Sequence, residues 1–130
     1  MSQILKKDMI DVTNLLEWFC KNGKTDFRPD AANAFRFLAS NGLIDSFYKE
    51  DMLRITDALA KCVEGFKNSK KYVSRAILEF SKRNLLFSYS KEEIFKISSK
   101  LLKYAVCDEA CGKSVQETVG FLNEIVNLKI

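Results

Sequence analysis

The sequence contains no histidine, one proline and five glycines in 130 residues. Without histidine the chain lacks the commonest general base, the usual partner of a serine or cysteine nucleophile, and the commonest metal ligand. Few glycines and a single proline disfavour an all-β fold, because such folds need many tight turns. No apolar run approaches the roughly 18 residues that a membrane span requires. These absences argue against an enzyme, against a metal and against a membrane protein.

The composition is that of an ordinary globular protein, with 47% apolar and 29% charged residues. At 130 residues we expect one domain, spanning residues 1–130. Residues 1–8 include two lysines but are followed by no apolar core of the signal-peptide type. Disulfide frameworks are expected mainly in short secreted chains. We therefore expect an intracellular protein, cytoplasmic or nuclear, in which all four cysteines are free thiols.

The chain repeats part of its own sequence at a regular interval. Segment 49–63 recurs as 91–105 with five identical positions, and segment 6–16 matches the start of the same pattern one period earlier. The connector 43–48 recurs as 85–90, and a matched connector arises by chance less readily than a match between two amphipathic helices. A fixed period of about 42 residues is typical of stacked helical repeats. We call the shift that carries residue 49 onto residue 91 the repeat spacing.

Apolar spacing and end signals predict six helices. Ser90 with Glu93, and Ser114 with Glu117, have the spacing of capping boxes, in which a hydroxyl and a carboxylate satisfy free backbone N–H groups. The second helix of each pair aligns so that Phe37 corresponds to Phe80. The predicted helices span about residues 2–22, 29–40, 49–66, 70–84, 90–106 and 114–128.

Three helix pairs, covering about residues 2–42, 43–84 and 85–130, resemble the armadillo and HEAT class of repeat proteins. The resemblance implies an all-α, right-handed α-solenoid of about three two-helix repeats. The one tryptophan, Trp18, lies on a first helix, so the tryptophan ladder of armadillo proteins that bind import signals is missing. The resemblance therefore names no cargo. The alternative is a compact six-helix adaptor bundle, which would share the helices but leave the period unexplained.

In armadillo-like stacks the second helices line a concave groove, and this implies a protein-interaction surface. We expect a non-enzymatic scaffold or adaptor that binds a peptide or helix of a partner protein there. An ordinary solvated helix face is the competing interpretation. The predicted partner-binding residues are Phe35, Arg36, Lys71, Arg75, Leu78, Glu79, Lys82 and Phe121.

A second hypothesis is a nucleic-acid-binding helical domain that uses the basic surface between Lys67 and Arg83. Lysine and arginine number 21 against 17 acidic residues, a net charge of only +4. A phosphate track needs sustained positive charge. Glu79, Glu117 and Glu124 interrupt it on the same helix faces, so a protein partner is preferred over nucleic acid.

The last predicted helix has apolar residues on more than one face. The end repeats of a solenoid need a polar cap or a partner, and exposed apolar area commonly marks an interface. We therefore expect one end of the stack to be covered, either by self-association or by a further segment or partner. The preferred version is a homodimer formed through Phe121, Ile125 and Leu128.

One local cluster invites a chemical interpretation: Cys107 and Cys111 with Asp108 and Glu109 between them. A structural zinc site needs four ligands, and one cysteine pair without histidine does not supply them. Acidic pairs elsewhere open predicted helices, where negative charge complements the helix dipole. No phosphate-binding loop or nucleophile motif is present. We expect no catalytic residue, no metal and no cofactor.

Overall fold

The structure, a computed structural model, describes residues 6–23, 27–65, 69–103 and 109–128. These residues form helices and no strand, which confirms the predicted all-α class. The helices are α1 (Lys6–Asn22), α2 (Phe27–Ser40), α3 (Lys49–Gly65), α4 (Lys70–Lys82), α5 (Lys91–Lys103) and α6 (Glu109–Asn127).

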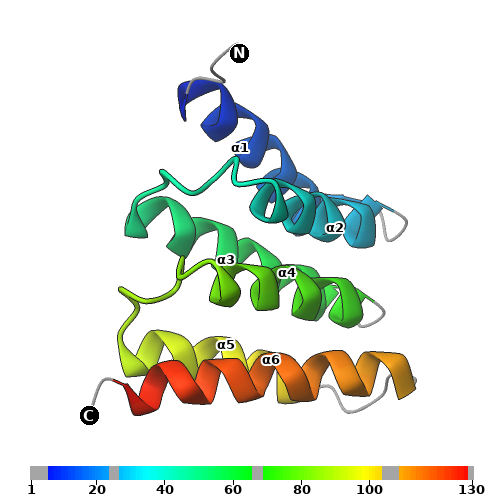
Figure 1. Cartoon of the computed structure of the whole chain (residues 1–130). Coiled ribbons are helices and arrows are strands. Elements are labelled where there is room, and N and C mark those ends of the chain that lie inside the picture. The colour runs from blue at the N-terminus through cyan, green and yellow to red at the C-terminus, as the bar shows by residue number, and fades with distance from the viewer. Residues whose placement is uncertain (1–5, 24–26, 66–68, 104–108, 129–130) are drawn as a thin grey trace.

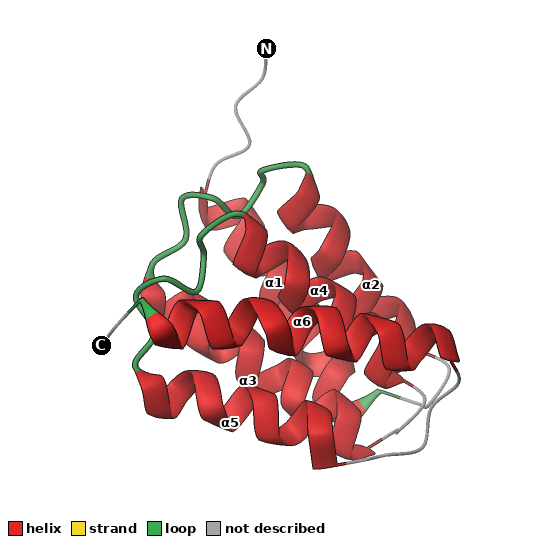
Figure 2. Ribbon diagram, turned by 60° about the horizontal axis from the view of Figure 1, so that its bottom comes forward, coloured by secondary structure: helices red, strands yellow, loops and turns green. Residues whose placement is uncertain are grey.

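The helices lie in three tiers, α1 with α2, α3 with α4, and α5 with α6 (Figure 1). Within the stack α4 packs on both α2 and α6, and α3 packs on both α1 and α5. Figure 2 views the same arrangement from the α5/α6 tier. The chain therefore has a layer of first helices (α1, α3, α5) and a layer of second helices (α2, α4, α6).

The capping box predicted at the start of α5 is confirmed. The Ser90 N–H donates to Glu93 Oε1 at 2.7 Å, and the Glu93 N–H donates to Ser90 Oγ at 3.2 Å. One of the two capping-box hydrogen bonds also forms at the start of α3, where the Tyr48 N–H donates to Asp51 Oδ2 at 3.0 Å. In each case a carboxylate accepts an N–H that the first helical turn leaves without a partner.

The capping box predicted at Ser114 is wrong, because α6 begins earlier, at Glu109. Ser114 lies inside the helix, and its carbonyl accepts the Thr118 hydroxyl at 2.8 Å. Cys111 and Val115, one helical turn apart, are both buried. Their burial on one face holds the first turns of α6 against the core, so the helix starts ahead of the serine.

The two connectors between tiers adopt the same turn. Gly42 and Asn84 both have positive φ, at 74° and 61°, a conformation that glycine and asparagine reach at low cost. Just after them, the Leu43 N–H donates to the Leu38 carbonyl at 3.0 Å, and the Leu85 N–H to the Phe80 carbonyl at 2.9 Å. Each residue of the first turn has its counterpart in the second at the repeat spacing.

Burial in the second helices follows the repeat spacing rather than the predicted alignment. The alignment pairs Phe37 with Phe80, but Phe37 is 55% exposed and Phe80 is fully buried. The repeat spacing pairs Phe35 with Ile77, and both are buried. The predicted alignment was thus shifted by one residue, which rotates a helix by about 100°.

The cysteines that the structure describes differ in whether they are free or disulfide-bonded. Cys20 and Cys62 are free and fully buried. Cys111 is disulfide-bonded, so the expectation of four free thiols is wrong at this position. Cys107 and Asp108 lie outside the described residues. Because disulfides are typical of oxidising compartments, the intracellular location stays a prediction.

Candidate functional site

The layer of second helices carries all eight of the predicted partner-binding residues. Lys71, Arg75 and Lys82 share one stripe of α4, spaced by one and then two helical turns. Lys71 and Arg75 are half-buried and Lys82 is exposed. The opposite face of α4 holds Val73 and Ile77, which are buried in the core. The stripe therefore points away from the core.

Two of the predicted residues are not surface groups. Phe35 is fully buried, and Leu78 is only 8% exposed. Arg36, Glu79 and Phe121 are half-buried.

Sequence reasoning missed Phe37, which is 55% exposed on α2. At the repeat spacing, Phe37 is the counterpart of Glu79 on α4 and of Phe121 on α6. Because neighbouring second helices pack side by side, these counterparts lie across one surface, which we call the second-helix face. The repeat spacing of the two connectors would have identified Phe37, because the same spacing applied to α2 and α4 fixes which face of α2 is exposed.

Charges of both signs meet on this face and beside it. Lys82 Nζ lies 4.0 Å from Glu117 Oε1 and so links α4 to α6. Arg83 makes a two-pronged contact with Asp45, at 2.9 Å from Nε and 2.7 Å from Nη2. This contact lowers the pKa of Asp45. The carboxylates therefore offset much of the positive charge in this region.

The remaining basic residues of the region have different surroundings. Lys70 is 3% exposed, and burial lowers the pKa of its ammonium group. Lys71 Nζ lies 5.4 Å from the centroid of the Tyr72 ring, within the range of a cation–π contact. Lys67 lies outside the described residues. Lys71 and Arg75 are thus the main cationic groups that α4 presents on its outer stripe.

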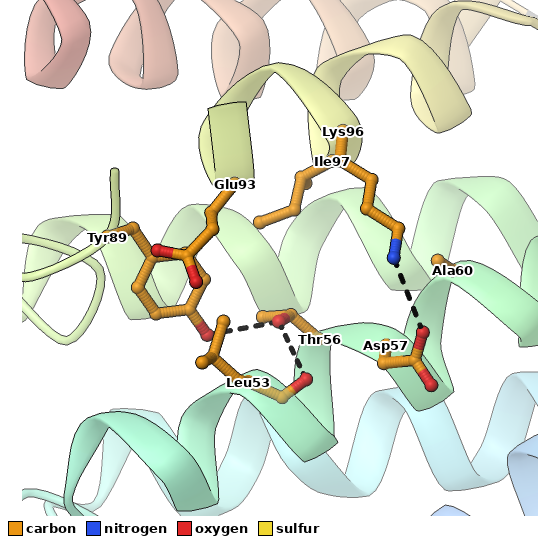
Figure 3. Close-up of a pocket in the computed structure, with 8 residues that line it drawn as sticks. All are labelled: Leu53, Thr56, Asp57, Ala60, Tyr89, Glu93, Lys96 and Ile97. Atoms are coloured by element: carbon orange, nitrogen blue, oxygen red, sulfur yellow. Dashed lines mark hydrogen bonds and ion pairs between the residues drawn. The ribbon is translucent and has the colours of Figure 1, made fainter. Parts of the chain in front are cut away.

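A cavity of about 270 Å³ lies between α3 and α5 in the layer of first helices (Figure 3). At its base the hydroxyls of Thr56 and Tyr89 are 3.0 Å apart, and Thr56 also donates to the Leu53 carbonyl at 3.3 Å. The eight lining residues are Leu53, Thr56, Asp57, Ala60, Tyr89, Glu93, Lys96 and Ile97.

The polar groups of this cavity serve to join the second tier to the third. Lys96 reaches Asp57 at 4.0 Å, and Glu93 binds Lys49 at 2.9 Å as well as capping α5. The Ser90 N–H and Lys49 lower the pKa of Glu93, and burial raises the pKa of Tyr89. Both shifts move away from neutral pH, the reverse of what a general acid or base requires. The cavity is thus an inter-tier crevice in which neither Glu93 nor Tyr89 is poised to transfer a proton near neutral pH.

Glu17 is the least well satisfied ionisable group among the described residues. It is 7% exposed on α1, and its Oε2 atom has no hydrogen-bond partner. Arg54 Nε on α3 is 3.8 Å from its Oε1 atom. Burial nevertheless raises the pKa of Glu17, because desolvation outweighs the attraction of Arg54.

We expect the Glu17→Gln variant to gain stability relative to the wild type as the pH rises. The folded protein keeps a proton on Glu17 above its ordinary pKa of 4.5, so the unfolded state loses its proton first and the carboxylate costs stability at higher pH. Glutamine keeps the shape and removes this cost. Urea unfolding of both proteins from about pH 4 to about pH 7 measures the difference. A difference that stays constant, or that turns against the variant, would show that the pair with Arg54 dominates.

The three residues predicted for self-association, in and just after α6, differ in how far they are exposed. Ile125 is 9% exposed and packs in the core, and Phe121 is half-buried. Leu128 is 74% exposed. The apolar positions of α6 are therefore used mostly inside the monomer, and Ile125 is not available at its surface.

Comparisons with protein-family models, curated proteins and solved structures find no match to this chain. In the part of the chain that the structure describes, no helix has both the length and the apolar character needed to cross a bilayer. The function is therefore inferred from the residues and their geometry alone.

Proposed function

We propose that the three tiers form a short α-solenoid of the armadillo or HEAT type rather than a compact six-helix bundle. The shared turn at Gly42 and Asn84 supports this, because one connector geometry that recurs at the repeat spacing stacks successive helix pairs in the same way. The intermediate position of α4, which packs on α2 and on α6, supports it as well. A compact bundle gives no reason for either regularity.

We further propose that the chain is a non-enzymatic scaffold that binds a peptide or helix of a partner protein on the second-helix face. The observation that carries this proposal is the mixed character of that face. Phe37 and Phe121 supply aromatic surface, Lys71 and Arg75 supply positive charge, and Glu79 supplies negative charge. Aromatic and arginine side chains are enriched in the energetic centres of protein interfaces.

Nucleic acid is the weaker alternative. Binding to a phosphate backbone depends on many uncompensated cations. Here Lys82 pairs with Glu117, Arg83 pairs with Asp45 and Lys70 is buried. Two outer cations on α4, next to a glutamate, suit a partner that carries both apolar and charged side chains.

Affinity capture from cell extract with mass spectrometry tests the proposed function. The full chain is compared with Arg75→Glu and Phe37→Ala on the second-helix face, and with Lys7→Glu on exposed α1 as the matched control. We expect a protein that the wild type and the Lys7→Glu control retain and that both face variants lose. Identical captured sets for all four proteins would contradict the proposal.

A parallel binding assay with fluorescent single-stranded RNA and duplex DNA tests the alternative. Because counterions are released from phosphates, nucleic-acid binding should weaken steeply with salt. We expect no such binding at physiological salt. Tight, salt-sensitive binding that Arg75→Glu abolishes would favour the nucleic-acid function instead.

A further inference from the structure

Two ion pairs between successive first helices repeat the same arrangement. Lys6 at the start of α1 lies 3.6 Å from Asp51 in the first turn of α3. Lys49 at the start of α3 lies 2.9 Å from Glu93 in the first turn of α5. The match of segment 6–16 to the segment that begins at Lys49 makes Lys49 the counterpart of Lys6. The repeat spacing makes Glu93 the counterpart of Asp51. Each tier thus offers a lysine to the acidic residue of the tier that follows.

The series has one unmatched member at each end of the stack. The next lysine is Lys91, the first residue of α5, and the preceding acid is Asp8, in the first turn of α1. Lys91 is half-buried and Asp8 is exposed. Neither has an ion-pair partner among the residues that the structure describes. The lysine end lies in the third tier, and the acid end lies in the first.

The first tier exposes apolar side chains whose counterparts are buried in the second tier. Val12 and Leu15 on α1 are 45% and 58% exposed. When Lys6 is aligned with Lys49, the counterparts of these two residues are Ile55 and Ala58 of α3. Both are fully buried in the tier that packs against α1. The α1 surface is therefore built like one that another tier covers.

An apolar crevice of about 200 Å³ opens between α1 and α2 in the same tier. Leu16, Phe19 and Phe27 line it, and the Phe19 and Phe27 rings are 6.1 Å apart. The counterparts of Leu16 and Phe19 on α3 are Leu59 and Cys62, and both are fully buried.

The third tier exposes the opposite half of the contact. Phe95 and Leu102 of α5 are 53% and 58% exposed. Their counterparts one repeat spacing earlier are Leu53 and Ala60 of α3, which line the crevice that faces α5 (Figure 3). The α5 surface thus repeats the side of α3 that receives the next tier.

We propose that the α5/α6 end of one copy binds the α1/α2 end of a second copy, head to tail. The stack continues across the boundary, and Lys91 of one copy pairs with Asp8 of the next. A second copy is the occupant that these observations favour, because the chain itself supplies both the lysine and acid ends and both matching apolar surfaces. A contact between two different surfaces leaves one free end on each copy, so the assembly grows with concentration until it closes into a ring or extends as a filament.

Two exposed leucines allow each end to be blocked separately. Leu15→Glu places a charge on the α1 end, and Leu102→Glu places one on the α5 end. Both sites are more than half exposed, so the fold should survive, and circular dichroism checks that it does. Sedimentation velocity on the full-length wild type should show an average mass that rises with concentration. Each variant alone should remain a monomer up to high micromolar concentration.

An equal mixture of the two variants decides the geometry. Each variant keeps one intact end, and the two intact ends are complementary, so the mixture should form a one-to-one dimer and nothing larger. A wild type that stays monomeric at high micromolar concentration would overturn the proposal. The proposal would also be overturned, in favour of a symmetric contact, if the wild type formed a closed dimer and the mixture of the two variants formed none.

Charge reversal tests the pairing of Lys91 with Asp8. Because exposed ion pairs are modest, Lys91→Glu and Asp8→Lys should each weaken association by roughly 2- to 10-fold. When the two reversed proteins are mixed, each junction between unlike variants again joins a positive to a negative side chain. The mixture should therefore recover the affinity of the wild type. Weakening without recovery on mixing would contradict the assignment of this pair.

Discussion

Replacing Leu59 with alanine should lower the free energy of unfolding by about 2–5 kcal/mol, and Leu101→Ala should have an effect in the same range. Leu59 on α3 and Leu101 on α5 are 0% and 1% exposed and are counterparts at the repeat spacing. Leu101 lines the same small cavity as Val63 and Ile77, where the second and third tiers meet. Each truncation removes apolar contacts and leaves a cavity that its rigid neighbours fill only in part.

Chemical denaturation measures both effects, with an unchanged dependence on denaturant as the sign that the folded and unfolded states stay comparable. Leu102→Ala is the matched control, because Leu102 adjoins Leu101 but is 58% exposed. The control should change stability by no more than about 0.5 kcal/mol. A loss of only a few tenths at Leu59 or Leu101 would mean that these positions are not equivalent core sites.

Replacing Phe35 with alanine should cost about 3–5 kcal/mol, the typical range for a buried phenylalanine. Phe35 is fully buried on α2, whereas Phe37, two residues away on the same helix, is 55% exposed. Phe37→Ala should therefore alter stability by no more than about 0.5 kcal/mol. The two variants share one chemical change and one helix, so intrinsic helix propensity cancels between them.

The comparison between Phe35 and Phe37 also tests the rotation of α2. If Phe37 were the counterpart of Phe80, it would occupy a buried position and would carry the larger cost. Urea unfolding of the two variants under one set of conditions distinguishes the alternatives. Equal losses, or a larger loss at Phe37, would contradict the packing described for α2.

Periodicity and capping chemistry were enough to predict the six helices, because both signals are local. The Ser90 capping box and the matched connectors formed as the sequence indicated. The Ser114 capping box did not, since the same spacing of serine and glutamate also occurs inside a helix. There the burial of Cys111 and Val115 decided where α6 begins.

The surface residues were harder to predict, because a shift of one residue changes the face of a helix. Phe35 was expected on the surface and lies in the core, while the exposed Phe37 was missed. Ile125 was expected at an interface and lies inside the monomer. Apolar residues alone do not show which of two adjacent positions faces a neighbouring helix.

Contacts between tiers were not predicted from the sequence. The structure pairs Lys49 with Glu93, and their counterparts Lys6 and Asp51 hold the same relation. The approach of Arg54 to the buried Glu17 has no such counterpart, since position 60, the equivalent of Glu17, is an alanine. It depends on how α1 and α3 are spaced, which no local pattern fixes.

The stacking of three equivalent tiers is tested most directly by distances between Ser40, Lys82 and Glu124. These exposed residues lie on α2, α4 and α6 and are counterparts at the repeat spacing. Spin labels attached through a ketone-bearing unnatural amino acid leave the native cysteines untouched, and electron paramagnetic resonance reads the distances. Packed helices are about 8–10 Å apart, so neighbouring pairs should give two short, similar distances, and Ser40 to Glu124 should measure about 20 Å. A Ser40 to Glu124 distance as short as the neighbouring ones would place α2 against α6 and contradict the stack.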